Sequence, residues 1–208
     1  MRAAEITVTG QGKGMQEALE ETERLGLIGG LAPKEVLRLR LLAEELFGMA
    51  RGIVGEEEAR YRIEADGKRF ELRLNVEMRM TQERKKQLLS VSSQGRNAAS
   101  TGFMGKLKDA IATALLPKES GLSFLSGFSM GCMSMAGAGG PEAQAAFADA
   151  FYWSMNQYKQ AVDETRADNS ESKEAWDELE KSIVANIADE VTVLVRGSRA
   201  EITIQKAF

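Results

Sequence analysis

The chain opens on a polar and apolar pattern that changes from strand spacing to helix spacing. Residues 5–9 alternate Ile6 and Val8 with polar neighbours, which predicts a short strand. From Met15 to Leu25 an apolar residue recurs every three or four positions, and a glycine pair follows at 29–30. This spacing places the apolar residues on one face of a helix, so we expect a helix that ends before the glycines.

The most extensive pattern belongs to a second helix. Pro33 suits a first helical turn, and apolar residues continue at helical spacing to about Val54 as a wide stripe. Asp66 and Gly67 then separate two alternating runs, a signal typical of a tight β-hairpin. Alternation places the apolar residues of the second run on one side of its strand, and we expect that side to face the long helix. These residues are Phe70, Leu72, Leu74 and Val76.

The second half of the chain continues the mixed pattern. Residues 81–105 are polar, basic and rich in Ser and Gly, which predicts a loop, and 103–116 predict a helix stopped by a proline. Helical spacing recurs from 141 to 162 and from 173 to 188, and alternation over 191–204 predicts a closing hairpin. The count is five strands, with no internal repeat.

The amino-acid composition excludes several kinds of catalytic and metal-binding site. The 208 residues include no histidine and a single cysteine, Cys132. Histidine-dependent triads, histidine-ligated metals and an internal disulfide framework are therefore excluded. The N-terminus lacks the apolar run of a secretory signal, so we expect a cytoplasmic protein. Residues 120–141 are uncharged but thinly apolar and rich in Gly and Ser, and we expect no membrane span.

Charge is unevenly placed although the formal net charge is only −4. Residues 79–108 hold seven basic residues and one acidic residue, and residues 163–180 hold eight acidic and two basic residues. The basic segment predicts an anion or nucleic-acid binder as one alternative function. Phe103 is its only aromatic residue, which makes base stacking, and hence nucleic acid as a partner, unfavourable.

Four stretches together resemble a known family. Residues 18–25, 31–34 and 37–46, with the sequence LRLRLLAEEL in the last, look like the start of anti-sigma-factor serine kinases, which belong to the histidine-kinase-like (GHKL) ATPases. The ending from Asn186 to Phe208 resembles that family's last helix and strand pair. The resemblance covers about 120 residues and omits 117–168. It implies one α+β two-layer sandwich over residues 1–208, a mixed five-strand sheet with helices on one face, and a helical insertion at about 117–170.

The resemblance also implies a nucleotide site. Glu45 fits the acidic residue that orients or activates the acceptor and holds magnesium, whereas the asparagine expected four positions later is Met49. A thioether suits a hard cation poorly, so we expect weak or absent magnesium binding. Glu77 is the residue that could replace the adenine-reading aspartate. The lid is matched by a glycine-rich segment before a helix, whose predicted phosphate cradle is Arg96, Gly102, Gly105 and Lys106.

Each of these signals has a structural alternative. Glu44 and Glu45 are also typical of the solvated edge of an apolar helix, and the lid glycines are typical of an ordinary loop. Glycines at 10, 12 and 14 between a strand and a helix match a dinucleotide fingerprint poorly, because the third is one place early.

The residues leave three functions open. The first, which we favour, is a degenerate ATPase domain that acts as a regulatory or signalling protein, binds ATP or ADP with magnesium weakly or not at all, and works through a protein partner or a second copy. The second is an active ATP-dependent protein serine kinase of the anti-sigma-factor type. The third is an anion or nucleic-acid binder that uses residues 79–108. Methionines and phenylalanines in 120–140 further predict an adaptable apolar contact surface.

Overall fold

The computed structural model describes residues 1–54, 58–77, 103, 105, 107, 111, 114, 150–167 and 169–208, the side chains of 50–54 excepted. Its contacts divide the chain into two compact units. The first unit holds residues 1–77, 183–192 and 201–208, and the second holds 78–182 and 193–200.

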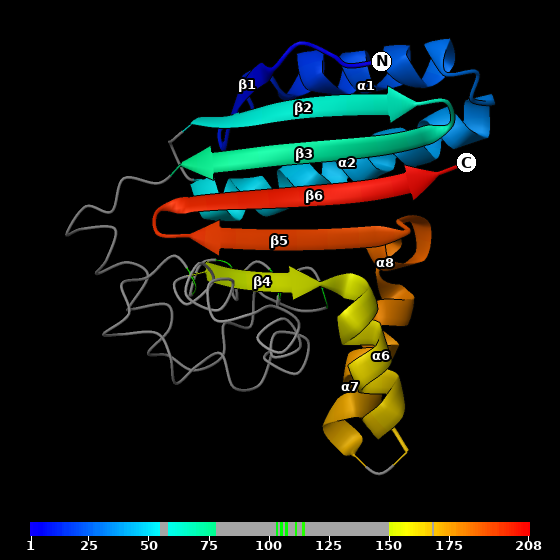
Figure 1. Ribbon diagram of the computed structural model, residues 1–208, viewed down its shortest axis with the longest axis vertical. Coiled ribbons are helices and arrows are strands. Elements are labelled where there is room, and N and C mark those ends of the chain that lie inside the picture. The colour runs from blue at the N-terminus through cyan, green and yellow to red at the C-terminus, as the bar shows by residue number, and fades with distance from the viewer. Residues whose placement is uncertain are drawn as a thin grey trace, which may run out of the picture. The chain divides into compact units, whose positions relative to one another are not determined.

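The described strands are β1 (Ile6–Thr9), β2 (Glu58–Asp66), β3 (Arg69–Glu77), β4 (Ala150–Ser154), β5 (Glu190–Arg196) and β6 (Arg199–Ala207). They are hydrogen bonded in the order β1-β2-β3-β6-β5-β4 (Figure 1). Register confirms that β1 and β3 both pair with β2 in the antiparallel sense, and the arrows of β3, β6, β5 and β4 alternate in direction. The sheet is therefore six-stranded and antiparallel, where the sequence predicted five strands and a mixed sheet.

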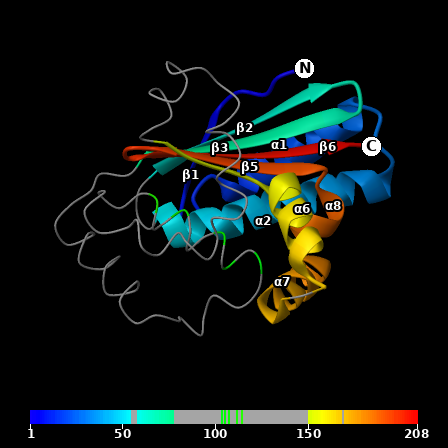
Figure 2. The ribbon, with the colours of Figure 1, turned by 60° about the horizontal axis from the view of Figure 1, so that its bottom comes forward.

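The described helices are α1 (Met15–Ile28), α2 (Pro33–Val54), α6 (Met155–Thr165), α7 (Ser170–Lys181) and α8 (Ile183–Ile187). In the first unit, α1 and α2 pack against each other, α2 contacts β1, β2 and β3, and α1 contacts β1 and β2. Figure 2 shows both helices on the same side of these strands. The α+β class is confirmed, as is the prediction that these two helices cover one face.

In the core of the first unit, buried residues recur at helical spacing on α2 and at every second position on β3. On α2, the residues spaced by three and four positions are all buried: Leu39, Leu42, Leu46 and Met49. On β3, the predicted row of Phe70, Leu72, Leu74 and Val76 is at most 2% exposed. Since α2 contacts β3, the prediction that this row faces the long helix is confirmed.

Two glycines close the two predicted hairpins. Gly67 has φ of 59° between β2 and β3, and Gly197 has φ of 56° between β5 and β6. Positive φ is strained for residues with a Cβ, so glycine at these positions allows the tight reversal. Both hairpins were read correctly from the sequence.

The predicted helix from 141 to 162 is wrong over part of its length. Residues 150–154 form β4, and α6 begins only at Met155. Phe151, Tyr152 and Trp153 favour extended backbone, and Ser154 caps the helix with a side chain that accepts a hydrogen bond from the Gln157 amide at 3.4 Å. This aromatic run forms β4, the strand that the prediction of five strands lacked.

The predicted helix from 173 to 188 is two helices. The Asn169 side chain caps α7 by accepting from the Glu171 amide at 2.9 Å, so the helix begins earlier than predicted. Ser182 adopts extended angles (φ −81°, ψ 123°) and separates α7 from α8. Farther upstream, the described residues 103, 105, 107, 111 and 114 are all helical, in agreement with the helix predicted over 103–116.

Within the described residues, no helix combines the length and the apolar character that a bilayer crossing requires.

Candidate functional site

Glu45 lies at the edge of the apolar stripe of α2. Its side chain is half-buried, and it forms no hydrogen bond or ion pair with any part of the chain that the structure describes. Burial raises the pKa of Glu45, and the neighbouring Glu44 carboxylate raises it further. Glu44 differs, because it is exposed and accepts a hydrogen bond from Arg40 Nε at 2.9 Å. Of the two glutamates, Glu45 is the one that combines partial burial with a raised pKa.

Met49 lies one turn farther along the same helix and is only 2% exposed. Its spacing from Leu42 and Leu46 places it within the core stripe. The position at which the resemblance places an asparagine is thus occupied by a packed thioether. A buried methionine offers magnesium no oxygen ligand, so Glu45 has no metal-binding neighbour at this position.

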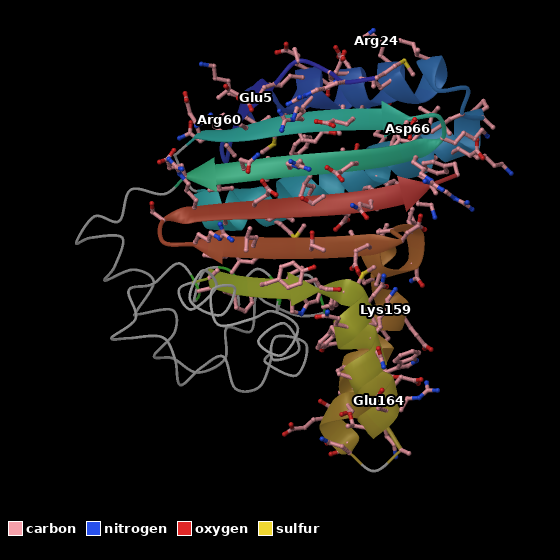
Figure 3. All side chains as sticks on the ribbon, viewed as in Figure 1. Glu5, Arg24, Arg60, Asp66, Lys159 and Glu164 are labelled. Carbon is pink, nitrogen blue, oxygen red and sulfur yellow. The ribbon has the colours of Figure 1, made fainter. Side chains whose placement is uncertain are left out.

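Glu77 does not join Glu45. It ends β3 one position after the buried Val76, so alternation turns its side chain to the face that α1 and α2 leave uncovered. There its carboxylate lies 3.7 Å from the guanidinium of Arg60, which also lies 3.8 Å from Glu5. Figure 3 labels Arg60 and Glu5 on this face. The two carboxylates of the predicted nucleotide site therefore belong to opposite sides of the sheet.

The predicted phosphate cradle falls mostly outside the described residues. Arg96, Gly102 and Lys106 lie there, as do residues 120–140 and all of the basic segment except 103, 105 and 107. Gly105 is helical and half-buried. These assignments remain predictions.

The glycines between β1 and α1 have a structural reason. Gly14 stands at the N-cap of α1 with φ of 75°, and a Cβ there would lie 2.1 Å from the Thr7 carbonyl oxygen. Gly12 also has positive φ, at 100°. Positive φ at Gly12 and Gly14, with the close approach at Gly14, accounts for these two glycines without a dinucleotide.

A cavity of about 700 Å³ opens at one end of the first unit's strands. It lies beside the β2–β3 turn and the end of β6, and its charged lining residues are of both signs: Arg2, Glu64, Asp66, Arg69, Glu71, Asp189 and Lys206. Part of this charge is internally paired, since Lys206 Nζ lies 2.7 Å from Asp189 Oδ1. The Ala207 amide donates to Asp189 Oδ2 at 2.6 Å. Burial opposes ionisation, but these two donors outweigh it and lower the pKa of Asp189.

A block of four charges on the uncovered face of β2 and β3 was missed by the sequence reasoning. Arg62 stands directly opposite Arg73, and Glu64 stands directly opposite Glu71. Like charges in directly opposite positions destabilise an antiparallel pair. The signal was present in the sequence, because a two-residue turn after Asp66 fixes which residues of the two strands face each other.

Over the described ranges, no group of three or more acidic or cysteine side chains is placed to hold a metal ion. Comparisons of the chain with protein-family models, with curated proteins and with solved structures found no match.

Proposed function

We propose that this chain is a regulatory domain of histidine-kinase-like architecture that has lost metal-dependent ATP turnover and acts through protein contacts. The observation that carries the proposal is the burial of Met49 in the core one turn after Glu45. Phosphoryl transfer needs magnesium held between protein oxygens and phosphates. Of the two protein ligands that the resemblance implies, Glu45 supplies an oxygen, whereas the buried thioether of Met49 supplies none.

The geometry of Glu77 supports the same conclusion. Its position beside Arg60 on the uncovered face separates it from α2, so it is poorly placed to read an adenine bound against that helix. A nucleotide in this domain would lack both the second metal ligand and the base-reading carboxylate. Weak binding or none is the expected result.

An active serine kinase is the second candidate, because the raised pKa of Glu45 is the property that a general base requires. Burial supplies that property without any metal. Since Glu45 forms no ion pair among the described residues, its carboxylate is free to accept a proton from a hydroxyl.

Calorimetry and turnover assays on the full chain separate the two candidates. Titration with ATP or ADP in the presence of magnesium should give little or no heat, and no magnesium-dependent hydrolysis or autophosphorylation should appear. Glu45→Ala tests the candidate base, and Glu44→Ala is the matched control because it removes the adjacent carboxylate that pairs with Arg40. Turnover that Glu45→Ala abolishes and Glu44→Ala retains would contradict the proposal and establish the kinase.

A further inference from the structure

The four-charge block of β2 and β3 is arranged in two rows across the strands. Arg62 and Arg73 form a basic row, and two residues along, Glu64 and Glu71 form an acidic row. The rows are about 7 Å apart, because side chains on one face of a strand repeat every two residues. The block has no net charge, so it is a dipole lying along the strands rather than an attractor for ions of one sign.

The acidic row is better satisfied than the basic row. Glu64 Oε1 lies 3.2 Å from Arg2 Nε, and Glu71 Oε2 accepts from Gln205 Nε2 at 3.1 Å. Each arginine also approaches the glutamate on its own strand, with Arg62 Nε at 3.3 Å from Glu64 and an ion pair between Arg73 and Glu71.

In spite of these contacts, the Nε–H groups of both arginines are buried and donate no hydrogen bond. Neither guanidinium is fully exposed, since the side chains of Arg62 and Arg73 are 20% and 31% accessible. Because the Nε atoms themselves are buried, only the accessible remainder of each guanidinium can meet a partner, and a carboxylate is the group that a guanidinium pairs with best.

We propose that this face binds a second copy of the chain, with the basic row of each copy against the acidic row of the other. A two-fold axis lying between the two faces, perpendicular to the strands and midway between the rows, exchanges the rows. It places Arg62 opposite Glu64 of the second copy and Arg73 opposite Glu71 of the second copy. An axis parallel to the strands would instead place Arg62 against Arg73, like charge against like.

A second copy fits this face better than a small anion does. An oxyanion at the basic row would lie within about 7 Å of two carboxylates, whereas a second copy supplies the opposite dipole in full. Antiparallel sheet faces about 10 Å apart leave room for arginine and glutamate side chains to meet between them. The proposal does not depend on nucleotide chemistry, and its failure would leave the proposed function untouched.

Sedimentation of the full chain tests the proposal through paired charge reversals. Wild type should dimerise reversibly, and the dimer should weaken as salt rises. R62E/R73E makes both rows acidic and E64R/E71R makes both rows basic, so each variant should dimerise at least about 100-fold more weakly than wild type. An equimolar mixture of the two variants should form a heterodimer, and the fourfold reversal should restore the homodimer.

Matched controls separate charge complementarity from misfolding. E21R/R24E exchanges the two charges of an ion pair on α1 and should leave dimerisation unchanged. If a reversal variant loses its circular dichroism spectrum, R62Q/R73Q and E64Q/E71Q replace it; each should lose dimerisation, and their mixture should not recover it. A wild type that stays monomeric to about 1 mM would overturn the proposal, even if a different protein bound this face. A dimer that these variants leave unchanged would overturn it as well.

Discussion

The two faces of the β2–β3 hairpin use the same backbone for different purposes. On the face toward α2, Ile63 pairs with Leu72, and both are fully buried in an apolar layer. On the other face, one residue along, Arg62 meets Arg73. The first face is what folding requires, because burial of apolar area drives it. On the second face, like charges stand directly opposite one another, an arrangement that opposes strand pairing.

The largest effect should come from the buried face. Leu72 is fully buried, so Leu72→Ala leaves a cavity, and we expect it to lower the free energy of unfolding by about 2–5 kcal/mol in urea denaturation. Asn75→Ala, on the half-buried opposite face of the same strand, is the control and should change stability by less than about 0.5 kcal/mol. Equal losses would show that the two faces do not differ as described.

A polar pair within the buried face should give the next largest effect. Thr22 Oγ1 donates to the Ala18 carbonyl at 2.7 Å, so the Tyr61 hydroxyl, also at 2.7 Å, must donate to Thr22. Burial raises the pKa of Tyr61, which keeps this donor protonated. Thr22→Val leaves the Tyr61 hydroxyl without an acceptor and should lower the free energy of unfolding by about 1–3 kcal/mol, whereas Tyr61→Phe should lower it by about 1 kcal/mol.

Calorimetric unfolding of both single variants and the double variant measures this coupling. The double variant should lose less stability than the sum of the single losses, because no buried donor is then left without an acceptor. Strict additivity would show that the two hydroxyls are not coupled.

The buried face could be predicted from the sequence almost completely, and the uncovered face could not. Alternation at Phe70 and Leu72 is sufficient to place them, because only one side of a strand can face a core. Glu77 was assigned to a nucleotide by family resemblance, yet its own strand turns it toward Arg60. Predicting the four-charge block requires the register between β2 and β3 as well as the residue pattern of each strand. Local sequence also missed β4, where an aromatic run favoured extended backbone inside a helical spacing.

The paired charges at the cavity offer a pH test. Asp189→Asn removes the ion pair with Lys206 and weakens acceptance from the Ala207 amide, and we expect a loss of about 1 kcal/mol at pH 7 after allowing for screening at this half-exposed carboxylate. The folded pKa of Asp189 is lowered, so this stability is present above the unfolded value near pH 4 and is lost as the pH falls through the folded pKa.

Thermal unfolding of wild type and Asp189→Asn from pH 7 to pH 2 measures this difference. The two curves should converge at the acidic end. A constant difference over the whole range would assign the effect to packing rather than to charge.

The cost of like-charge pairing can be measured apart from association. E71R/R73E exchanges the two charges of β3, so that Arg62 would face an acidic residue and Glu64 a basic one. At protein concentrations low enough to keep the chain monomeric, this exchange should raise the free energy of unfolding by about 0.5 kcal/mol. The control exchange E21R/R24E on α1 should be close to neutral. A loss of stability in E71R/R73E would show that the existing pairs along each strand matter more than the pairs across the strands.

The smallest effect concerns Glu45, a carboxylate at the edge of the apolar stripe of α2 that has no ion pair within the described part of the chain. Because burial raises its pKa in the folded state, ionisation of Glu45 opposes folding. Its contribution to stability is most favourable below the unfolded value near pH 4.3 and is lost as the pH rises through the folded pKa. Glu45→Gln should therefore stabilise the protein at pH 7 by a few tenths of a kcal/mol, given that half of the side chain keeps its water, and the gain should vanish below about pH 4. Glu44→Gln removes the ion pair with Arg40 and should show no such gain. Added magnesium should leave the Glu45→Gln gain unchanged if the metal site is lost; a gain that magnesium reverses would show that Glu45 binds the ion and would contradict the proposed regulatory role without turnover.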